Sequence, residues 1–117
     1  MKKMITLNLF NKSRLEKEFK EINAIYQNES FLFKIDNIKT LISPQKFTRE
    51  NDEYKFSLDI LNKKATYLLK QQNYMFDIDV EKIIYKKENN SIILEYKISS
   101  ADEIIKIELI VEGEINE

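Results

Sequence analysis

The chain has 117 residues, 43% of them hydrophobic and 33% charged, which predicts a globular protein with one domain over residues 1–117. Its 19 basic and 20 acidic residues leave a net charge of −1, which argues against binding to duplex nucleic acid, because such binding usually depends on a basic excess. The chain contains no Cys and no His, which excludes disulfides and Cys-based zinc sites and removes the commonest general base of enzymes.

The N-terminal residues predict a first strand in which Ile5, Leu7 and Leu9 share one face. A signal peptide is not expected, because Asn8 and the pair Asn11–Lys12 interrupt the apolar run. No apolar stretch approaches the length that a membrane-crossing helix needs. We therefore expect a cytoplasmic protein that has no membrane as a partner.

Residues 14–26 carry the local signals of a helix. Ser13 and Glu16 have the spacing of a capping box, and apolar residues then recur at helical spacing, namely Leu15, Phe19, Ile22 and Tyr26. A strand over residues 19–27 is the alternative, although it would mix polar and apolar side chains on each face. A helix here would cap one end of the fold or dock a partner through its apolar face.

From residue 31 onward, apolar and polar residues alternate in short stretches that polar turns separate. Side chains of a strand point alternately to opposite faces, so each stretch has one core face and one solvated face. The strands are expected over residues 31–35, 38–42, 47–49, 54–60, 65–69, 74–85, 92–98 and 105–111, with a bulge near residues 82–85. No helix separates the later strands, so the pattern predicts a single antiparallel β-barrel of about eight strands.

Arg49 is followed by a turn at Glu50–Asn51 and by a strand that begins at Tyr54. Four later strand stretches then follow, at residues 64–67, 76–80, 92–98 and 107–111. In this order and spacing the chain resembles the YwiB-like family of uncharacterised bacterial proteins, whose fold is a calycin-type, lipocalin-like β-barrel. Family members tend to have glycine where Asn51 and Asn73 stand, and Asn tolerates the same left-handed backbone. The family has no assigned activity, so the resemblance implies a fold and no function.

Inward-facing tyrosines and one arginine are the candidate ligand-binding residues. A barrel of about eight strands can hold one small ligand, and buried tyrosine hydroxyls need partners that a ligand can supply. If Arg49 points inward it can anchor an anionic group, and if it points outward it is a surface charge. A core filled solidly by these side chains is the commoner alternative. The candidates are Arg49, Tyr54, Tyr67, Tyr74 and Tyr96.

Other patterns have simpler explanations. Asp77 and Asp79 share a strand face and would suit a divalent cation or acid–base work, but the solvated face of a strand explains the same pattern, as it does for Glu95 and Glu108. The aromatic residues are in phase with aliphatic ones, which predicts core positions and not a base-stacking platform. We expect no catalytic residues, no metal site and no cofactor.

The sequence favours a protein that is not an enzyme and that binds a small apolar or amphiphilic ligand inside the barrel. One alternative is a protein-interaction module that docks partners on an edge strand or on the helical face of residues 14–26. A second alternative is weak binding of single-stranded RNA. The oligomeric state is not predicted, and a fold of this kind does not by itself imply a function.

Overall fold

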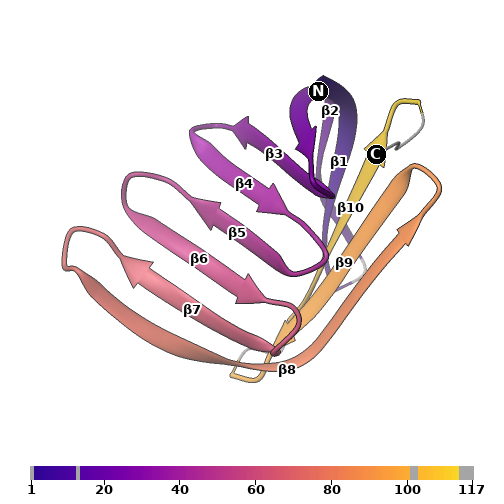
Figure 1. Cartoon of the computed structure of the whole chain (residues 1–117). Helices are drawn as coiled ribbons and strands as arrows, with labels where there is room; N and C mark the ends of the chain where they lie inside the picture. Colours follow the sequence, from indigo (N-terminus) through magenta and orange to yellow (C-terminus); the bar gives the residue numbers. More distant parts are fainter. Residues whose placement is uncertain (1, 13, 101–102, 114–117) are drawn as a thin grey trace.

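The computed structural model describes residues 2–12, 14–100 and 103–113, and all regular structure within these ranges is β (Figure 1). The strands form a closed antiparallel barrel in which each strand neighbours the next one along the chain, and β1 pairs with β10. They are β1 (Lys2–Asn11), β2 (Arg14–Gln27), β3 (Ser30–Ile35), β4 (Ile38–Ile42), β5 (Lys46–Glu50), β6 (Tyr54–Asp59), β7 (Lys64–Leu69), β8 (Tyr74–Glu88), β9 (Ser91–Ile98) and β10 (Ile104–Val111).

This architecture confirms the predicted antiparallel β-barrel, with ten strands among the described residues where about eight were expected. Apolar and polar residues alternate for the predicted reason, because the side chains of each strand point alternately into the core and to the outer face. In β9, for example, Ile92, Leu94 and Tyr96 are buried in the core, while the residues between them lie on the outer face. No membrane-crossing helix is found in the described ranges.

The predicted helix over residues 14–26 is wrong, because these residues form β2, which pairs with β1. The register of this pair shifts at two points, and at each point β2 has one residue more than β1. Glu21, in the first of these bulges, has a left-handed backbone with φ of 57°. The bulge puts Phe19 and Ile22, three residues apart, on one inward face. Tyr26 lies four residues after Ile22, which is twice the normal two-residue repeat of a strand, so it faces inward as well. A bulged strand has therefore reproduced the spacing of a helix.

Two further parts of the helix prediction have separate outcomes. Leu15 lies opposite Phe10 on the outer face and is exposed, so it does not share a face with the inward residues of β2. Ser13, the first residue of the predicted capping box, lies outside the described residues. The segment is part of the barrel wall, and no helical face exists there to cap the barrel or to dock a partner.

The long strand β8 belongs to two parts of the barrel wall, as its bend in Figure 1 shows. Its first half pairs with β7 and its second half with β9, and the register shifts between Val80 and Lys82. The inward residues therefore change from even numbers, such as Ile78, to odd numbers, such as Ile83. The predicted bulge is present, slightly nearer the N-terminus than expected.

The two ends of the barrel differ in how their interiors are filled. Because all neighbours are antiparallel, β1, β3, β5, β7 and β9 all run toward the same end, which we call the open end. At the opposite, closed end the inward side chains are almost fully buried, namely Ile5, Tyr26, Phe31, Ile42, Leu58, Ile92 and Val111. At the open end the inward side chains are half-buried or exposed, namely Leu9, Phe19, Ile35, Ile38, Arg49, Tyr54, Tyr67, Tyr74 and Phe76.

Candidate functional site

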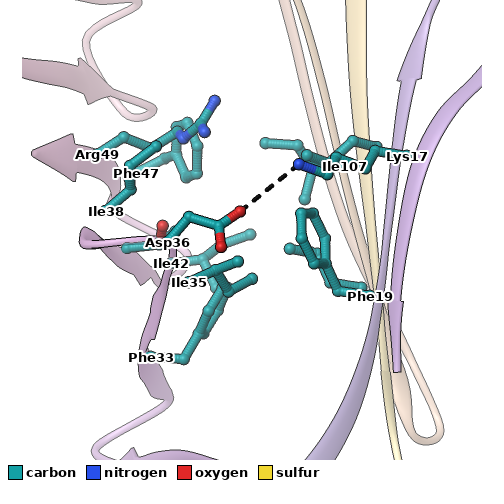
Figure 2. A pocket seen from close by; sticks show the side chains of 13 residues that line it. Lys17, Phe19, Phe33, Ile35, Asp36, Ile38, Ile42, Phe47, Arg49 and Ile107 are labelled. Carbon is teal, nitrogen blue, oxygen red and sulfur yellow. Dashed lines mark ion pairs between the residues drawn. The ribbon is translucent and has the colours of Figure 1, made fainter. Parts of the chain in front are cut away.

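A cavity of about 100 Å³ lies between β2 and the hairpin formed by β3 and β4, and it reaches from the open end inward to Ile42. The barrel wall is split here, because β2 and β3 pair only where Ile25–Gln27 meets Ser30–Leu32. Figure 2 shows Lys17 and Phe19 of β2 on one side of the split and the β3–β4 hairpin on the other. The lining is mainly apolar and consists of Leu7, Leu9, Lys17, Phe19, Phe33, Ile35, Asp36, Ile38, Thr40, Ile42, Phe47, Arg49 and Ile107.

An ion pair bridges the outer side of this split. The Lys17 Nζ lies 3.6 Å from the Asp36 Oδ2, and both side chains are exposed (Figure 2). The Lys17 ammonium also lies over the Phe19 ring, 4.7 Å from its centroid. An exposed ion pair of this kind contributes about 0–1 kcal/mol. The contact therefore joins the two sides of the split only weakly.

Arg49 is an inward-facing residue of β5. Its register partners are Thr40 on β4 and Phe56 on β6, which are both buried, and its side chain lines the cavity. Within the residues that the structure describes, the guanidinium makes no ion pair with a carboxylate. The open end thus holds a half-buried cation whose charge no carboxylate of the described chain neutralises.

Tyr96 is a buried, inward-facing residue of β9 on which the charge of Arg49 acts. Its ring packs against Phe47 and Phe56, with centroids 6.1 and 5.8 Å apart. Burial raises the pKa of Tyr96 to about 12; the charge of Arg49 lowers it and the nearby Tyr54 raises it further. The hydroxyl is therefore neutral at physiological pH.

The raised pKa of Tyr96 predicts a loss of stability at high pH. An unfolded tyrosine ionises near pH 10, and the folded pKa is about 12, so the stabilisation from the neutral phenol is complete below pH 10 and is lost as the pH rises to 12. In urea unfolding between these pH values, the wild type should lose about 1 kcal/mol per pH unit more than Tyr96→Phe. Parallel pH profiles for the two proteins would show that Tyr96 is not buried as described.

A row of aromatic rings crosses β6, β7 and β8 on the inward face of the open end. The Tyr54 and Tyr67 rings are stacked with centroids 5.3 Å apart, and Phe76 lies 5.4 Å from Tyr67. Tyr74 continues the row, 5.7 Å from Phe76. The face is inward because Ala65, two residues before Tyr67 on β7, is a buried core residue.

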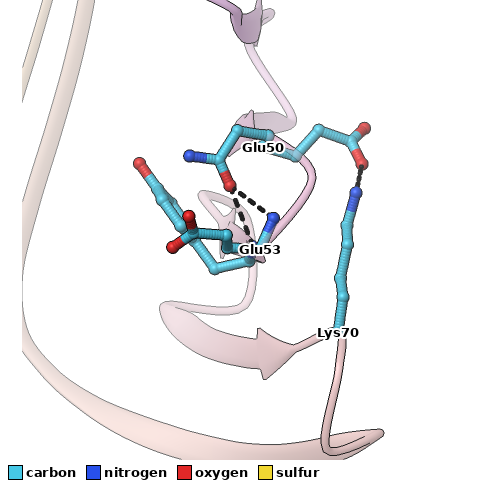
Figure 3. A network of polar contacts seen from close by, with 5 residues as sticks. Glu50, Glu53 and Lys70 are labelled. Carbon is cyan, nitrogen blue, oxygen red and sulfur yellow. Dashed lines mark hydrogen bonds and ion pairs between the residues drawn. The ribbon is translucent and has the colours of Figure 1, made fainter.

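The turn before Tyr54 is held by side-chain contacts that Figure 3 shows. Asn51 Oδ1 accepts hydrogen bonds from the backbone N–H groups of Glu53 and Tyr54 at 2.8 and 3.0 Å. The Lys70 ammonium donates to Glu50 at 3.0 Å, and this hydrogen bond lowers the pKa of the Glu50 carboxyl despite its partial burial. These contacts position the start of β6, and with it the first ring of the aromatic row.

The two asparagines at the expected glycine positions behave differently. Asn73 has the left-handed backbone that such a position requires, with φ of 48°. Asn51 is not among the residues with positive φ and instead turns the chain through its side-chain hydrogen bonds.

All five candidate ligand-binding residues lie toward the open end, but not in one cluster. Arg49 lines the cavity, whereas Tyr96 is buried and does not belong to the cavity lining. Tyr54 and Tyr67 belong to the aromatic row, on the other side of Phe56 from Arg49. Tyr74 is 57% exposed, so its predicted core position is wrong, although its face is the inward one.

Sequence reasoning missed the side of the cavity that β2 supplies. Lys17 and Phe19 fall within the predicted helix, and Asp36 was expected on the polar side of the strand around residues 31–35, so their meeting across the split was not expected. At each bulge an additional polar residue interrupts the alternation of apolar and polar residues, at Glu16 and at Lys20–Glu21. These interruptions would have indicated the bulges if the segment had been interpreted as a strand.

The remaining candidates lie on the outer face. Asp77 and Asp79 are exposed opposite Thr66 and Lys64. Glu95 forms an ion pair with Lys82 at 3.1 Å, and Glu108 accepts a hydrogen bond from the Asn8 amide at 3.0 Å. Across the described ranges, no three Asp or Glu side chains come together in a way that would hold a metal ion.

No protein-family model, no curated protein and no solved structure matches this chain. The resemblance to the YwiB-like family therefore stays a prediction, and function is inferred from the geometry of the open end.

Proposed function

We propose that this protein is a calycin-like binding protein of the cytoplasm that holds a small, partly apolar ligand in the open end of its barrel. The observation that carries the proposal is the asymmetry of the interior. Inward residues such as Phe31 and Leu109 are fully buried toward the closed end, whereas Phe19, Ile35 and Ile38 around the cavity are only half-buried. Apolar surface left open in this way is stabilised when a ligand covers it.

The size of the cavity restricts the ligand. Sites for drug-sized molecules usually measure about 300–1,000 Å³, and the cavity here measures about 100 Å³. The ligand is therefore small, or only part of it enters the cavity and the rest lies in the mouth of the barrel. The split beside β2 gives a route into the cavity from solvent.

Native mass spectrometry of gently purified protein tests this proposal. We expect the wild type to carry a small molecule that denaturation releases. Ile38→Trp should lose it, because Ile38 lines the cavity and is half-buried at the start of β4, so the larger ring would fill the mouth. Ile93→Trp is the matched control, since Ile93 is also half-buried but lies on the outer face of β9. Bare wild-type protein, or equal occupancy in Ile38→Trp, would contradict the proposal.

One observation supports the alternative of a protein-interaction module. Within the described residues, β2 is hydrogen-bonded to β1 on one side, and its other side is unpaired before Ile25. An unpaired strand edge can accept an additional strand from a partner. The exposed side chains along this edge are mostly charged, however, which opposes such pairing.

A further inference from the structure

We propose that the ligand is a short-chain monoanion, a carboxylate whose head is bound by the Arg49 guanidinium and whose alkyl tail fills the cavity. This inference rests on the proposed function and specifies its ligand.

The charge of the lining favours a single negative charge on the ligand. Three charged side chains line the cavity, and Lys17 and Asp36 neutralise each other across the split. Arg49 remains, and Glu50, the next residue along β5, is already paired with Lys70 at 3.0 Å. A half-buried guanidinium gains most from a charged acceptor, because its donors are otherwise incompletely satisfied. One uncompensated positive charge matches a carboxylate better than a dianionic phosphate monoester.

The surroundings of Arg49 suit a carboxylate in geometry as well. The planar guanidinium can donate two parallel hydrogen bonds to the two oxygens of one carboxylate. The Tyr96 phenol lies close enough for the charge of Arg49 to act on it, and it stays protonated at neutral pH. It therefore places no competing negative charge near the guanidinium.

The apolar part of the cavity sets the length of the tail. Below Arg49 the lining consists of apolar side chains of five strands, among them Leu7, Phe33, Ile42, Phe47 and Ile107. An apolar cavity of about 150 Å³ holds a benzene molecule, so a cavity of about 100 Å³ accommodates about four carbons. With the carboxyl carbon and one methylene in the mouth, a chain of about six carbons fills the site.

The probes are straight-chain carboxylates from acetate to decanoate, compared with the alcohol of the same length, in calorimetric titrations of the wild type. We expect each added methylene to tighten carboxylate binding about fourfold up to about hexanoate, with little gain beyond it. We also expect hexanoate to bind at least about tenfold more tightly than hexanol, because only the carboxylate makes a charge-assisted pair with the guanidinium. This comparison needs no variant.

Two variants locate the anion. In Arg49→Gln, hexanoate should bind about tenfold or more weakly while hexanol binding is unchanged. Lys55→Gln is the matched control, because it removes the same charge from the outer face of the neighbouring strand β6 and should leave both affinities unchanged.

The outcomes separate this inference from the proposed function. If hexanol binds as tightly as hexanoate, or if Arg49→Gln binds hexanoate like the wild type, the anion assignment is overturned and the apolar site stands. If neither hexanoate nor hexanol binds, both the assignment and the proposed function are overturned.

Discussion

Phe31→Ala is expected to lower the free energy of unfolding by about 3–5 kcal/mol, whereas Phe76→Ala should change it by about 1 kcal/mol or less. Phe31 is fully buried at the closed end, where its ring packs 4.6 Å from that of Tyr26, so truncation would leave a cavity that the surrounding strands cannot fill. Phe76 is also inward-facing, but 37% of it is exposed at the open end.

Urea unfolding curves of the two variants and the wild type measure this contrast. The pair is matched because both are phenylalanines on the inward face of a strand. Similar losses in the two variants would mean that the two ends of the barrel are packed alike, and the open end described here would then be an ordinary core.

Removing the charges from the unpaired edge of β2 is expected to convert the protein into a self-associating one. Glu18 and Lys20 lie on this edge, exposed and 3.9 Å apart, and the edge carries unpaired backbone groups because β3 does not reach it. Charged side chains on an edge strand prevent pairing between molecules, and threonine favours strand pairing. The double variant Glu18→Thr/Lys20→Thr should therefore form dimers or larger species as its concentration rises.

Sedimentation velocity over a range of concentrations distinguishes the cases. Lys106→Thr/Glu108→Thr is the matched control, because it also removes one base and one acid two residues apart without changing net charge, on β10, which is paired with β1 and with β9 at both residues. We expect the control to sediment like the wild type. If the β2 variant also does so, the edge is not available for pairing, and the interaction-module alternative loses its support.

The sequence predicted β3 to β10 well because each of these strands has a core face and a solvated face. In β6, for instance, Phe56 and Leu58 are buried and the residues between and beside them are not. The strand β2 was hidden for a physical reason. Its two bulges break the period of two, and the left-handed residue of the first bulge is Glu21, where a glycine or asparagine would have given a signal.

The candidate site was predictable in part. The inward direction of Arg49 follows from its register opposite Phe56. Because β5 is short, residues 46–50 alone do not indicate which of its side chains face inward. The split beside β2 depends on how far β2 and β3 diverge, which is a property of the whole barrel and leaves no local pattern in the sequence. For the same reason, nothing in the alternation of β8 distinguishes the exposed Tyr74 from the inward residues that follow it.

The central claim is that a small apolar molecule enters the barrel at the open end and nowhere else. Isoleucine methyl NMR spectra recorded during a hexanol titration test this claim directly, since isoleucines lie on both faces of the wall. We predict that the methyl signals of Ile35, Ile38 and Ile107, which line the cavity, shift together and saturate. The signals of Ile93 and Ile110 on the outer face should not move. Shifts confined to the outer isoleucines, or no saturable shift at the cavity, would contradict the account.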